Sequence, residues 1–162
     1  MGNKALFLDR DGTINKDFGY VYEKEKLVFL KGTIEGLKKF QDSNYKLIII
    51  TNQSGIGRNY FSEKEYLEFN DYMLNKLLEK GIKIDKVYYC KHSPDENCDC
   101  RKPKLKLFYD AINDFNIDLD NSVAIGDNKR DIAICNETNV KGFILGENNC
   151  NSIDDVAKII LN

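Results

Sequence analysis

Five short runs of mainly apolar residues, several of them rich in β-branched Val and Ile, recur along the chain, and each is nearly continuous rather than alternating with polar residues. Such runs are typical of strands that are covered on both faces, as in a parallel sheet. They occupy residues 5–8, 46–50, 87–89, 123–125 and 142–145. Apolar residues recur with a helical period between them, near residues 34–40, 66–78, 105–115 and 156–160. This alternation predicts an α/β fold, a doubly wound and mainly parallel sheet with helices on both faces.

The length and the charge of the chain limit the number of domains and the kinds of partner that it can have. At 162 residues it is the size of one domain and has no Pro-, Gly- or Ser-rich linker, so we expect a single domain over residues 1–162. Its 24 basic and 26 acidic residues leave no cationic surplus, so no nucleic-acid partner is expected. No apolar run reaches the ~20 residues of a membrane span, and no secretory signal precedes Leu8. We therefore expect a cytoplasmic monomer with no membrane partner.

Two carboxylates, Asp9 and Asp11, follow the first apolar run, where the chain leaves the sheet. Doubly wound folds bind their ligands at this edge. One carboxylate of such a pair can attack phosphorus, while the other protonates the leaving oxygen and then activates water. Gly12 frees the turn, and Thr13 adds a hydroxyl near an incoming anion. Asp-x-Asp-Gly is also an ordinary turn sequence, so the pair alone leaves both interpretations open.

Polar side chains follow the later runs as well. Asp127 and Asp131 come after the fourth run and supply the anionic charge that a hard cation such as Mg²⁺ requires. Asp127 could instead cap the helix that runs through Ile132. Hydroxyl, amide and cationic donors for a phosphate group follow two other runs, and they are Thr51, Asn52, Arg101 and Lys102.

Taken together, this set resembles the motifs of the haloacid dehalogenase-like phosphatase superfamily across nearly the whole chain. The matching residues are Asp9 to Thr13, Thr51-Asn52, Lys102, and Gly126-Asp127 through Asp131. The resemblance implies that Asp9 is the nucleophile, which forms a phospho-aspartate, and that Asp11 is the general acid and base. It also implies that Thr51 and Lys102 bind the transferred phosphoryl group. Mg²⁺ would be held by Asp9, Asp127 and the carbonyl of Asp11, and Asp131 would position its neighbours. The chain has no long insertion, so it resembles the members without a cap domain.

Four residues with metal-ligating side chains lie in the polar stretch before Lys102, and they are Cys90, His92, Cys98 and Cys100. Two such pairs separated by a short loop can close a tetrahedral Zn²⁺ site. The Asn, Asp, Glu and Pro residues around them indicate an exposed loop, where unligated thiols gain nothing. The spacing therefore favours a structural zinc site over scattered core residues. The remaining cysteines, Cys135 and Cys150, are predicted to be free thiols.

The zinc loop and the Arg-Lys-Pro sequence that follows it are similar to those of two phosphatase families. Residues 102–107 and the short loop resemble the histidinol-phosphate phosphatases. Residues 19–21 and 51–58 resemble the D-glycero-D-manno-heptose-1,7-bisphosphate 7-phosphatases, although Gly57 and Asn59 depart from that family's usual residues. A bisphosphate brings a second dianion, which Arg58 and Arg101 could bind, whereas the ammonium of histidinol phosphate would be repelled by them. We therefore predict the heptose bisphosphate, a small phosphorylated metabolite, as the substrate, with histidinol phosphate as the alternative.

Two classes without enzymatic activity compete with the phosphatase. A phospho-receiver module also places aspartates at the ends of parallel strands, and a zinc-stapled binding module would explain the cysteines. Asp11, followed by Gly12 and Thr13, favours the enzyme, because a receiver has no need of an acid two residues beyond its phosphorylated aspartate.

Overall fold

The computed structural model describes residues 2–162, in which five strands form one sheet and every neighbouring pair runs parallel. The order of the strands is β3-β2-β1-β4-β5. Their bounds are Lys4–Leu8 for β1, Tyr45–Asn52 for β2, Lys86–Cys90 for β3, Val123–Gly126 for β4 and Lys141–Ile144 for β5. Four of the predicted runs lie within these strands, and the fifth, 142–145, extends one residue beyond β5, so the predicted parallel sheet is confirmed.

Helices connect the strands at the predicted positions. The α-helices are α1 (Thr33–Asp42), α2 (Ser54–Gly57), α3 (Glu63–Glu79), α4 (Lys106–Phe115) and α5 (Ile153–Ile160). Short 3-10 helices fill several loops, and they are η1 (Lys24–Lys26), η2 (Pro94–Glu96), η3 (Leu119–Asn121) and η4 (Lys129–Asn136). The four helical stretches predicted from periodicity correspond to α1, α3, α4 and α5, and the single turn of α2 is an addition. The doubly wound α/β fold is therefore confirmed.

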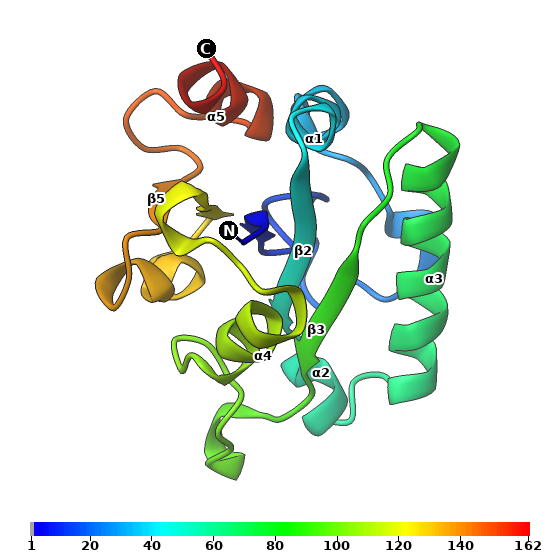
Figure 1. Cartoon of the computed structure of the whole chain (residues 1–162). Coiled ribbons are helices and arrows are strands. Elements are labelled where there is room, and N and C mark those ends of the chain that lie inside the picture. The colour runs from blue at the N-terminus through cyan, green and yellow to red at the C-terminus, as the bar shows by residue number, and fades with distance from the viewer. Residues whose placement is uncertain (1) are drawn as a thin grey trace.

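Helices cover both faces of the sheet because alternate residues of each strand point to opposite sides. In β1, Leu6 and Leu8 belong to an apolar cluster that includes residues of α1, α3 and α5. Ala5 and Phe7 belong to a second cluster, with residues of α4 and η4. Figure 1 shows α3 and α4 on either side of strands β2 and β3. Each large apolar side chain that is fully buried in this way stabilises the fold by roughly 1.5–3 kcal/mol.

The start of α3 is fixed by a capping box. The Ser62 hydroxyl accepts a hydrogen bond from the Glu65 N–H at 3.0 Å, and the Glu65 carboxylate accepts one from the Ser62 N–H at 2.8 Å. A cap of this kind contributes about 1 kcal/mol. It also sets the register with which Tyr66 and Phe69 of α3 reach the buried guanidinium of Arg10.

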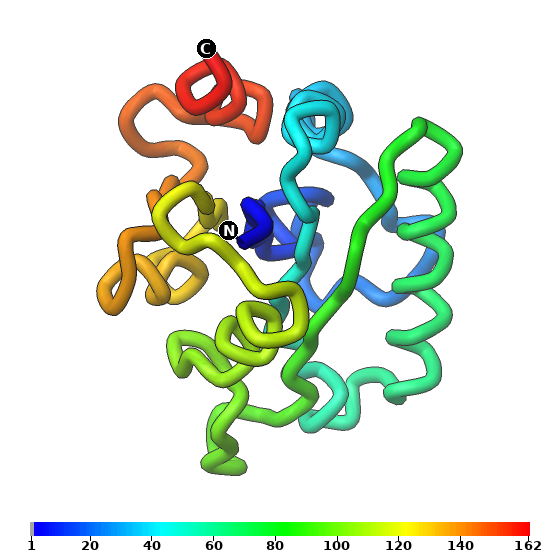
Figure 2. The backbone as a smooth tube through the Cα atoms, in the orientation of Figure 1, coloured from blue at the N-terminus to red at the C-terminus, as the bar shows by residue number. Residues whose placement is uncertain are grey.

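The loops that follow the strands gather at one end of the molecule, as parallel strands require. In Figure 2, α2 and the loop after β3 lie beside each other at the lower end of the trace. They pack so closely that a Cβ atom at Gly57 would lie 2.5 Å from the Ser93 nitrogen. The side chains that follow β2 and β3 are therefore brought together at this end.

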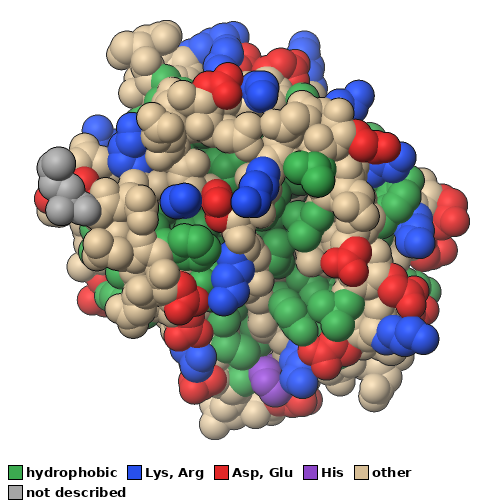
Figure 3. All heavy atoms as spheres, turned by 45° about the vertical axis from the view of Figure 1, so that its right-hand side comes forward, with side chains coloured by type: hydrophobic (Ala, Val, Ile, Leu, Met, Phe, Trp, Pro, Cys, Tyr) green, Lys and Arg blue, Asp and Glu red, His purple; other side chains and the backbone are tan. Residues whose placement is uncertain are grey.

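The molecular surface in Figure 3 carries basic and acidic side chains interspersed around a strip of hydrophobic ones. On this face no broad area of a single charge stands out. Among residues 2–162, no helix is both long enough and apolar enough to cross a membrane.

Candidate active site

Asp9 lies immediately after β1, where its N–H donates to the Ile125 carbonyl of β4 at 3.1 Å. This bond continues the pairing of β1 with β4 and fixes the direction in which the carboxylate leaves the sheet. Burial raises the pKa of Asp9 to about 7; the attraction of Lys102 opposes this rise, and the nearby carboxylates of Asp131 and Asp11 add to it. Asp9 and Asp131 share the single ammonium of Lys102, so the site holds more negative charge than this lysine neutralises, which favours the binding of a further cation.

Lys102 is the buried cation of the site, and its side chain is only 1% exposed. Its ammonium donates to Asp9 Oδ1 at 3.0 Å, to Asp131 Oδ1 at 2.8 Å and to the Ile50 carbonyl at 2.5 Å. All three of its donors are thereby used. Because a buried ammonium is stable only when it is paired and hydrogen-bonded, this lysine depends on both carboxylates.

Asp131 supports the turn after β4. Its Oδ2 accepts hydrogen bonds from the backbone N–H groups of Asp127 and Asn128, at 3.2 and 3.1 Å. The close approach requires a glycine at position 126, since a Cβ atom there would lie 2.1 Å from the Asp131 Cβ. With Oδ1 on Lys102 and Oδ2 on the backbone, Asp131 has both oxygens occupied and acts as a support.

Asp127 does not cap the helix that follows it. Asn128 takes that position, and its side-chain oxygen accepts from the Arg130 N–H. The alternative interpretation of Asp127 as a helix cap is therefore wrong. Burial, followed by the charge of Asp131, raises the pKa of Asp127. The backbone at Gly12 comes so close that a Cβ atom there would lie 2.1 Å from Asp127 Oδ2.

Three carboxylates meet between β1 and β4, since one oxygen from each of Asp9, Asp127 and Asp131 lies within 4.8 Å of the others. A Mg²⁺ ion prefers one or two carboxylates and takes its remaining ligands from water and phosphate. Asp9 and Asp127 suit this role because their oxygens are less occupied than those of Asp131.

Asp11 is not part of this carboxylate cluster, and its own carboxylate accepts hydrogen bonds from four side-chain N–H donors. Arg10 Nε donates to Oδ2 at 3.1 Å and Arg10 Nη2 to Oδ1 at 2.9 Å, while Asn15 Nδ2 and Gln53 Nε2 donate at 3.0 and 3.1 Å. Arg10 is fully buried, donates also to the Val21 carbonyl at 2.7 Å and lies 4.8 Å over the Phe69 ring. The orientation of the Asp11 carboxylate is therefore fixed.

Gln53 joins Asp11 to the predicted phosphate ligand Thr51. Its amide nitrogen donates to Thr51 Oγ1 at 2.9 Å as well as to Asp11 Oδ2. The Thr51 hydroxyl itself donates to the Asn52 carbonyl at 3.5 Å, a long bond that it would give up to donate to a bound anion. Thr13, by contrast, is fully buried, and its hydroxyl has no hydrogen-bond partner among the described residues.

Asn52 has contacts that the sequence did not predict. Its Oδ1 accepts from the Lys102 N–H at 2.9 Å, and its Nδ2 donates to the Lys102 carbonyl at 3.2 Å. The amide therefore pairs with the backbone of Lys102 and fixes the point at which that lysine enters the site. Its predicted role as a phosphate ligand stays a prediction, and these contacts favour a supporting role.

A cavity of about 340 Å³ opens beside the carboxylates. Asp9, Asp11 and Asp127 line it, together with the predicted anion ligands Arg58 and Arg101. Sequence reasoning missed Arg130, Gln53 and Tyr20, which line it as well. The Tyr20 ring makes an edge-to-face contact with Tyr60, 4.7 Å between ring centres.

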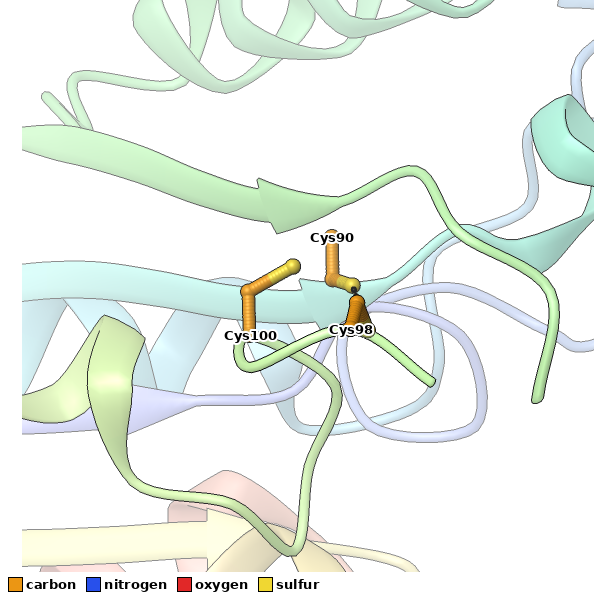
Figure 4. Close-up of side chains that lie close together, drawn as sticks. All are labelled: Cys90, Cys98 and Cys100. Carbon is orange, nitrogen blue, oxygen red and sulfur yellow. Dashed lines mark hydrogen bonds between the residues drawn. The ribbon is translucent and has the colours of Figure 1, made fainter. Parts of the chain in front are cut away.

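The predicted zinc ligands come together only in part. Figure 4 shows Cys90 at the end of β3 with its sulfur toward those of Cys98 and Cys100, and the sulfurs of Cys90 and Cys98 are 3.6 Å apart. His92 is not in this group, since its Nδ1 lies 3.6 Å from a Glu96 carboxylate oxygen. Three thiols at such distances suit a soft divalent metal such as Zn²⁺.

Comparisons with known proteins agree with this geometry. A family model described as polynucleotide kinase 3 phosphatase matches residues 5–145. The chain belongs to this family of haloacid dehalogenase-like phosphatases. It is 43% identical over 152 residues to the D-glycero-β-D-manno-heptose-1,7-bisphosphate 7-phosphatase of Haemophilus ducreyi, covering 90% of this chain and 84% of the relative. It is 46% identical over 144 residues to the Helicobacter pylori protein of the same name, with coverages of 88% and 83%.

A solved structure of a haloacid dehalogenase-like phosphatase has the same arrangement of elements. The D,D-heptose 1,7-bisphosphate phosphatase from B. bronchiseptica, complexed with magnesium and phosphate, superposes with a TM-score of 0.88 at 25% identity, over 98% of both chains. The chain is accordingly a phosphoric monoester hydrolase of the haloacid dehalogenase-like fold.

Proposed function

We propose that this phosphatase removes the 7-phosphate of D-glycero-D-manno-heptose 1,7-bisphosphate through a phospho-aspartate at Asp9, with Mg²⁺ as its catalytic cofactor. The observation that carries the proposal is the position of Lys102 between Asp9 and Asp131, with Asp11 and Asp127 open to the same cavity. The names of the two relatives support the choice of substrate. The proposal treats residues 1–162 as one domain.

Asp9, Asp127 and the backbone carbonyl of Asp11 would hold the magnesium ion. Asp131 would support them through Lys102 and the backbone after β4. The magnesium complex of the B. bronchiseptica phosphatase supports this choice of metal. When bound, the ion supplies positive charge that lets an anionic nucleophile approach a phosphate dianion. Lys102 adds a fixed positive charge at the same carboxylate and so favours the ionised form of Asp9.

In the first step a carboxylate oxygen of Asp9 attacks phosphorus. The bond from phosphorus to the sugar oxygen breaks, and Asp11 gives its proton to that oxygen. In the second step Asp11 takes a proton from a water molecule, whose oxygen attacks phosphorus and displaces Asp9. Inorganic phosphate leaves, and both carboxyl groups return to their initial states. The Thr51 hydroxyl and the Lys102 ammonium would bind the transferred group, and the ammonium would exchange one of its three present hydrogen bonds for a phosphate oxygen.

The substrate's second phosphate would be bound by Arg58 and Arg101, which line the cavity from two different loops. Neither arginine forms an ion pair with another described residue, so both are available to an anion. Histidinol phosphate stays the alternative substrate, since residues 102–107 resemble its phosphatases. Its ammonium group would be repelled by these guanidiniums, and Asp17 is the carboxylate lining the cavity that could offset the repulsion.

We also propose a structural Zn²⁺ bound by Cys90, Cys98 and Cys100, with His92 as the fourth ligand. The ring of His92 would have to turn away from Glu96 to complete the tetrahedron. A site with four protein ligands leaves no open position for substrate, so its role would be to hold the loop that carries Arg101 and Lys102.

Phosphate release from heptose 1,7-bisphosphate, histidinol phosphate and simple sugar monophosphates tests the function. Asp9→Asn should abolish turnover with every substrate, and Asp11→Asn should slow it by at least ~10²-fold, as expected for a lost general acid. Normal turnover by Asp9→Asn would rule out the phospho-aspartate. A higher kcat/KM for histidinol phosphate than for heptose bisphosphate would reverse the choice of substrate and leave the phosphatase assignment intact.

A further inference from the structure

The chain uses arginine very sparingly. It contains four arginines against 20 lysines, out of 24 basic residues. Arg10 is buried behind Asp11, and the other three, Arg58, Arg101 and Arg130, all line the cavity beside the carboxylates. None of the lysines within residues 2–162 lines it. If the basic residues were distributed at random, lysines would be expected at this cavity more often than arginines.

Arginine and lysine differ in the anions that they recognise. The guanidinium presents a rigid fork of N–H donors that binds two phosphate oxygens at once, whereas an ammonium is a point charge. The use of lysine elsewhere and of arginine in this cavity therefore indicates recognition of an oxyanion. Two of the three arginines, Arg58 and Arg101, already have a proposed role, and Arg130 has none.

Arg130 lies on the side of the cavity formed after β4. It occupies the first turn of η4, between Asn128, which caps that helix, and the buried Asp131. Arg130 and Asp127 line the same cavity. Within the described chain no carboxylate lies within ion-pair distance of Arg130. Its guanidinium is thus free, next to the proposed cation site.

The transferred phosphoryl group has enough partners without Arg130. Lys102 and the proposed cation would compensate its charge, and Thr51 would donate a hydrogen bond to it. A monophosphate would therefore leave three guanidiniums without an anion. A substrate with a second phosphate uses them. Arg130 approaches from the loop after β4, whereas Arg58 follows α2 and Arg101 follows the cysteine loop. Three loops would therefore surround the second anion.

From this placement we infer that Arg130 is a specificity-determining residue, which binds the phosphate that is not transferred. The inference rests on the proposed function and extends it, since it assigns the bisphosphate preference to a third arginine from a third loop. Arg130 makes its contact equally in the ground state and in the transition state, so its loss raises KM and leaves kcat nearly unchanged.

The test compares Arg130→Met with the same substitution at a neighbouring basic residue that does not line the cavity. Lys129→Met is that control, because it removes one positive charge from the preceding residue of the same helix. The two substrates are heptose 1,7-bisphosphate and heptose 7-phosphate, which differ only in the second phosphate. A charged hydrogen bond to phosphate accounts for a change of about 10- to 100-fold in affinity.

Arg130→Met should lower kcat/KM for the bisphosphate by about tenfold or more, and for the monophosphate by less than about threefold. The kcat/KM of Arg130→Lys for the bisphosphate should lie between those of Arg130→Met and the wild type, since lysine keeps the charge and loses the forked pair of donors. Lys129→Met should resemble the wild type with both substrates. An independent readout is the dissociation constant of each sugar phosphate for the Asp9→Asn protein, measured by calorimetry with and without Arg130→Met.

Equal losses with both substrates would overturn the inference, because Arg130 would then serve the transferred phosphoryl group. If Arg130→Met leaves kcat/KM for the bisphosphate unchanged, the inference is overturned as well. The proposed function stays intact in that case, provided that the wild type hydrolyses the bisphosphate normally. A wild type that neither binds nor hydrolyses the bisphosphate would refute the proposed function, and this inference with it.

Discussion

Replacing Asp9 by asparagine should stabilise the magnesium-free protein while it removes the proposed nucleophile. Burial raises the pKa of the Asp9 carboxyl from 3.8 to about 7, although Lys102 opposes the rise. The difference corresponds to about 4 kcal/mol, which is what the folded state loses by holding this group as a carboxylate. Asparagine carries no charge and keeps one acceptor for Lys102, but it weakens that contact. We therefore expect a gain of about 2–4 kcal/mol in the free energy of unfolding at pH 8.

The pH dependence of this gain follows from the sign of the pKa change. Below about pH 4 the carboxyl is protonated in the folded and unfolded states alike, and the variant and the wild type should be equally stable. Between about pH 4 and pH 7 the unfolded chain ionises while the folded protein keeps the proton, so the wild type is progressively destabilised. Above about pH 7 both states are ionised, and the difference should stay constant.

Urea unfolding at several pH values between about 4 and 8 measures this difference. Magnesium is omitted, but no chelator is added, so that a metal in the cysteine loop is retained. Added Mg²⁺ should then stabilise the wild type and not Asp9→Asn, because only the wild type offers the carboxylate. If Asp9→Asn were no more stable than the wild type at pH 8, or if its advantage did not grow with pH, the electrostatic account of this site would be wrong.

Two further changes test the supports of the site. The purified protein should contain about one zinc per chain. Removing the zinc with a chelator should lower activity even in excess Mg²⁺, because the loop that carries Arg101 and Lys102 loosens. Protein that is prepared without chelator and contains no zinc would refute this prediction. Gln53→Met should reduce kcat/KM more for an alkyl phosphate than for p-nitrophenyl phosphate, whose leaving group needs no proton, since the amide orients Asp11. Equal losses with both substrates would indicate a purely structural role, and Gln41→Met, remote from the site at Gly81, serves as the control.

The carboxylates and the lysine of the site could be predicted from the sequence because each follows a recognisable strand. A parallel sheet brings the carboxyl ends of its strands to one edge, so Asp9, Asp127 and Lys102 needed only their order along the chain to be placed together. The strands themselves were recognisable because burial on both faces leaves runs that are almost entirely apolar, with Lys46 at the start of one of them.

The residues that sequence reasoning missed share a different property, since their roles depend on packing between distant segments. Arg130 and Lys129 are adjacent basic residues, and only the winding of η4 brings Arg130 rather than Lys129 to the cavity. Gln53 reaches Asp11 across 42 positions, and Asn52 reaches Lys102 across 50. His92 shows the opposite case, because its spacing suggested a ligand whereas its ring lies beside Glu96.

The pairing of Asn52 with the backbone of Lys102 has a consequence for how this enzyme can change over time. The cysteine loop is tied at both ends to consecutive residues of the chain, since the Gln53 N–H donates to the Cys90 carbonyl at 2.7 Å and Asn52 holds Lys102. Extra residues inserted near Pro94–Glu96 would therefore lengthen the loop without moving its ends, and doubling a loop costs only about 0.6 kcal/mol. This turn is a position where the chain can acquire a new segment over the cavity, and with it a new range of substrates, while the reactive groups stay where they are.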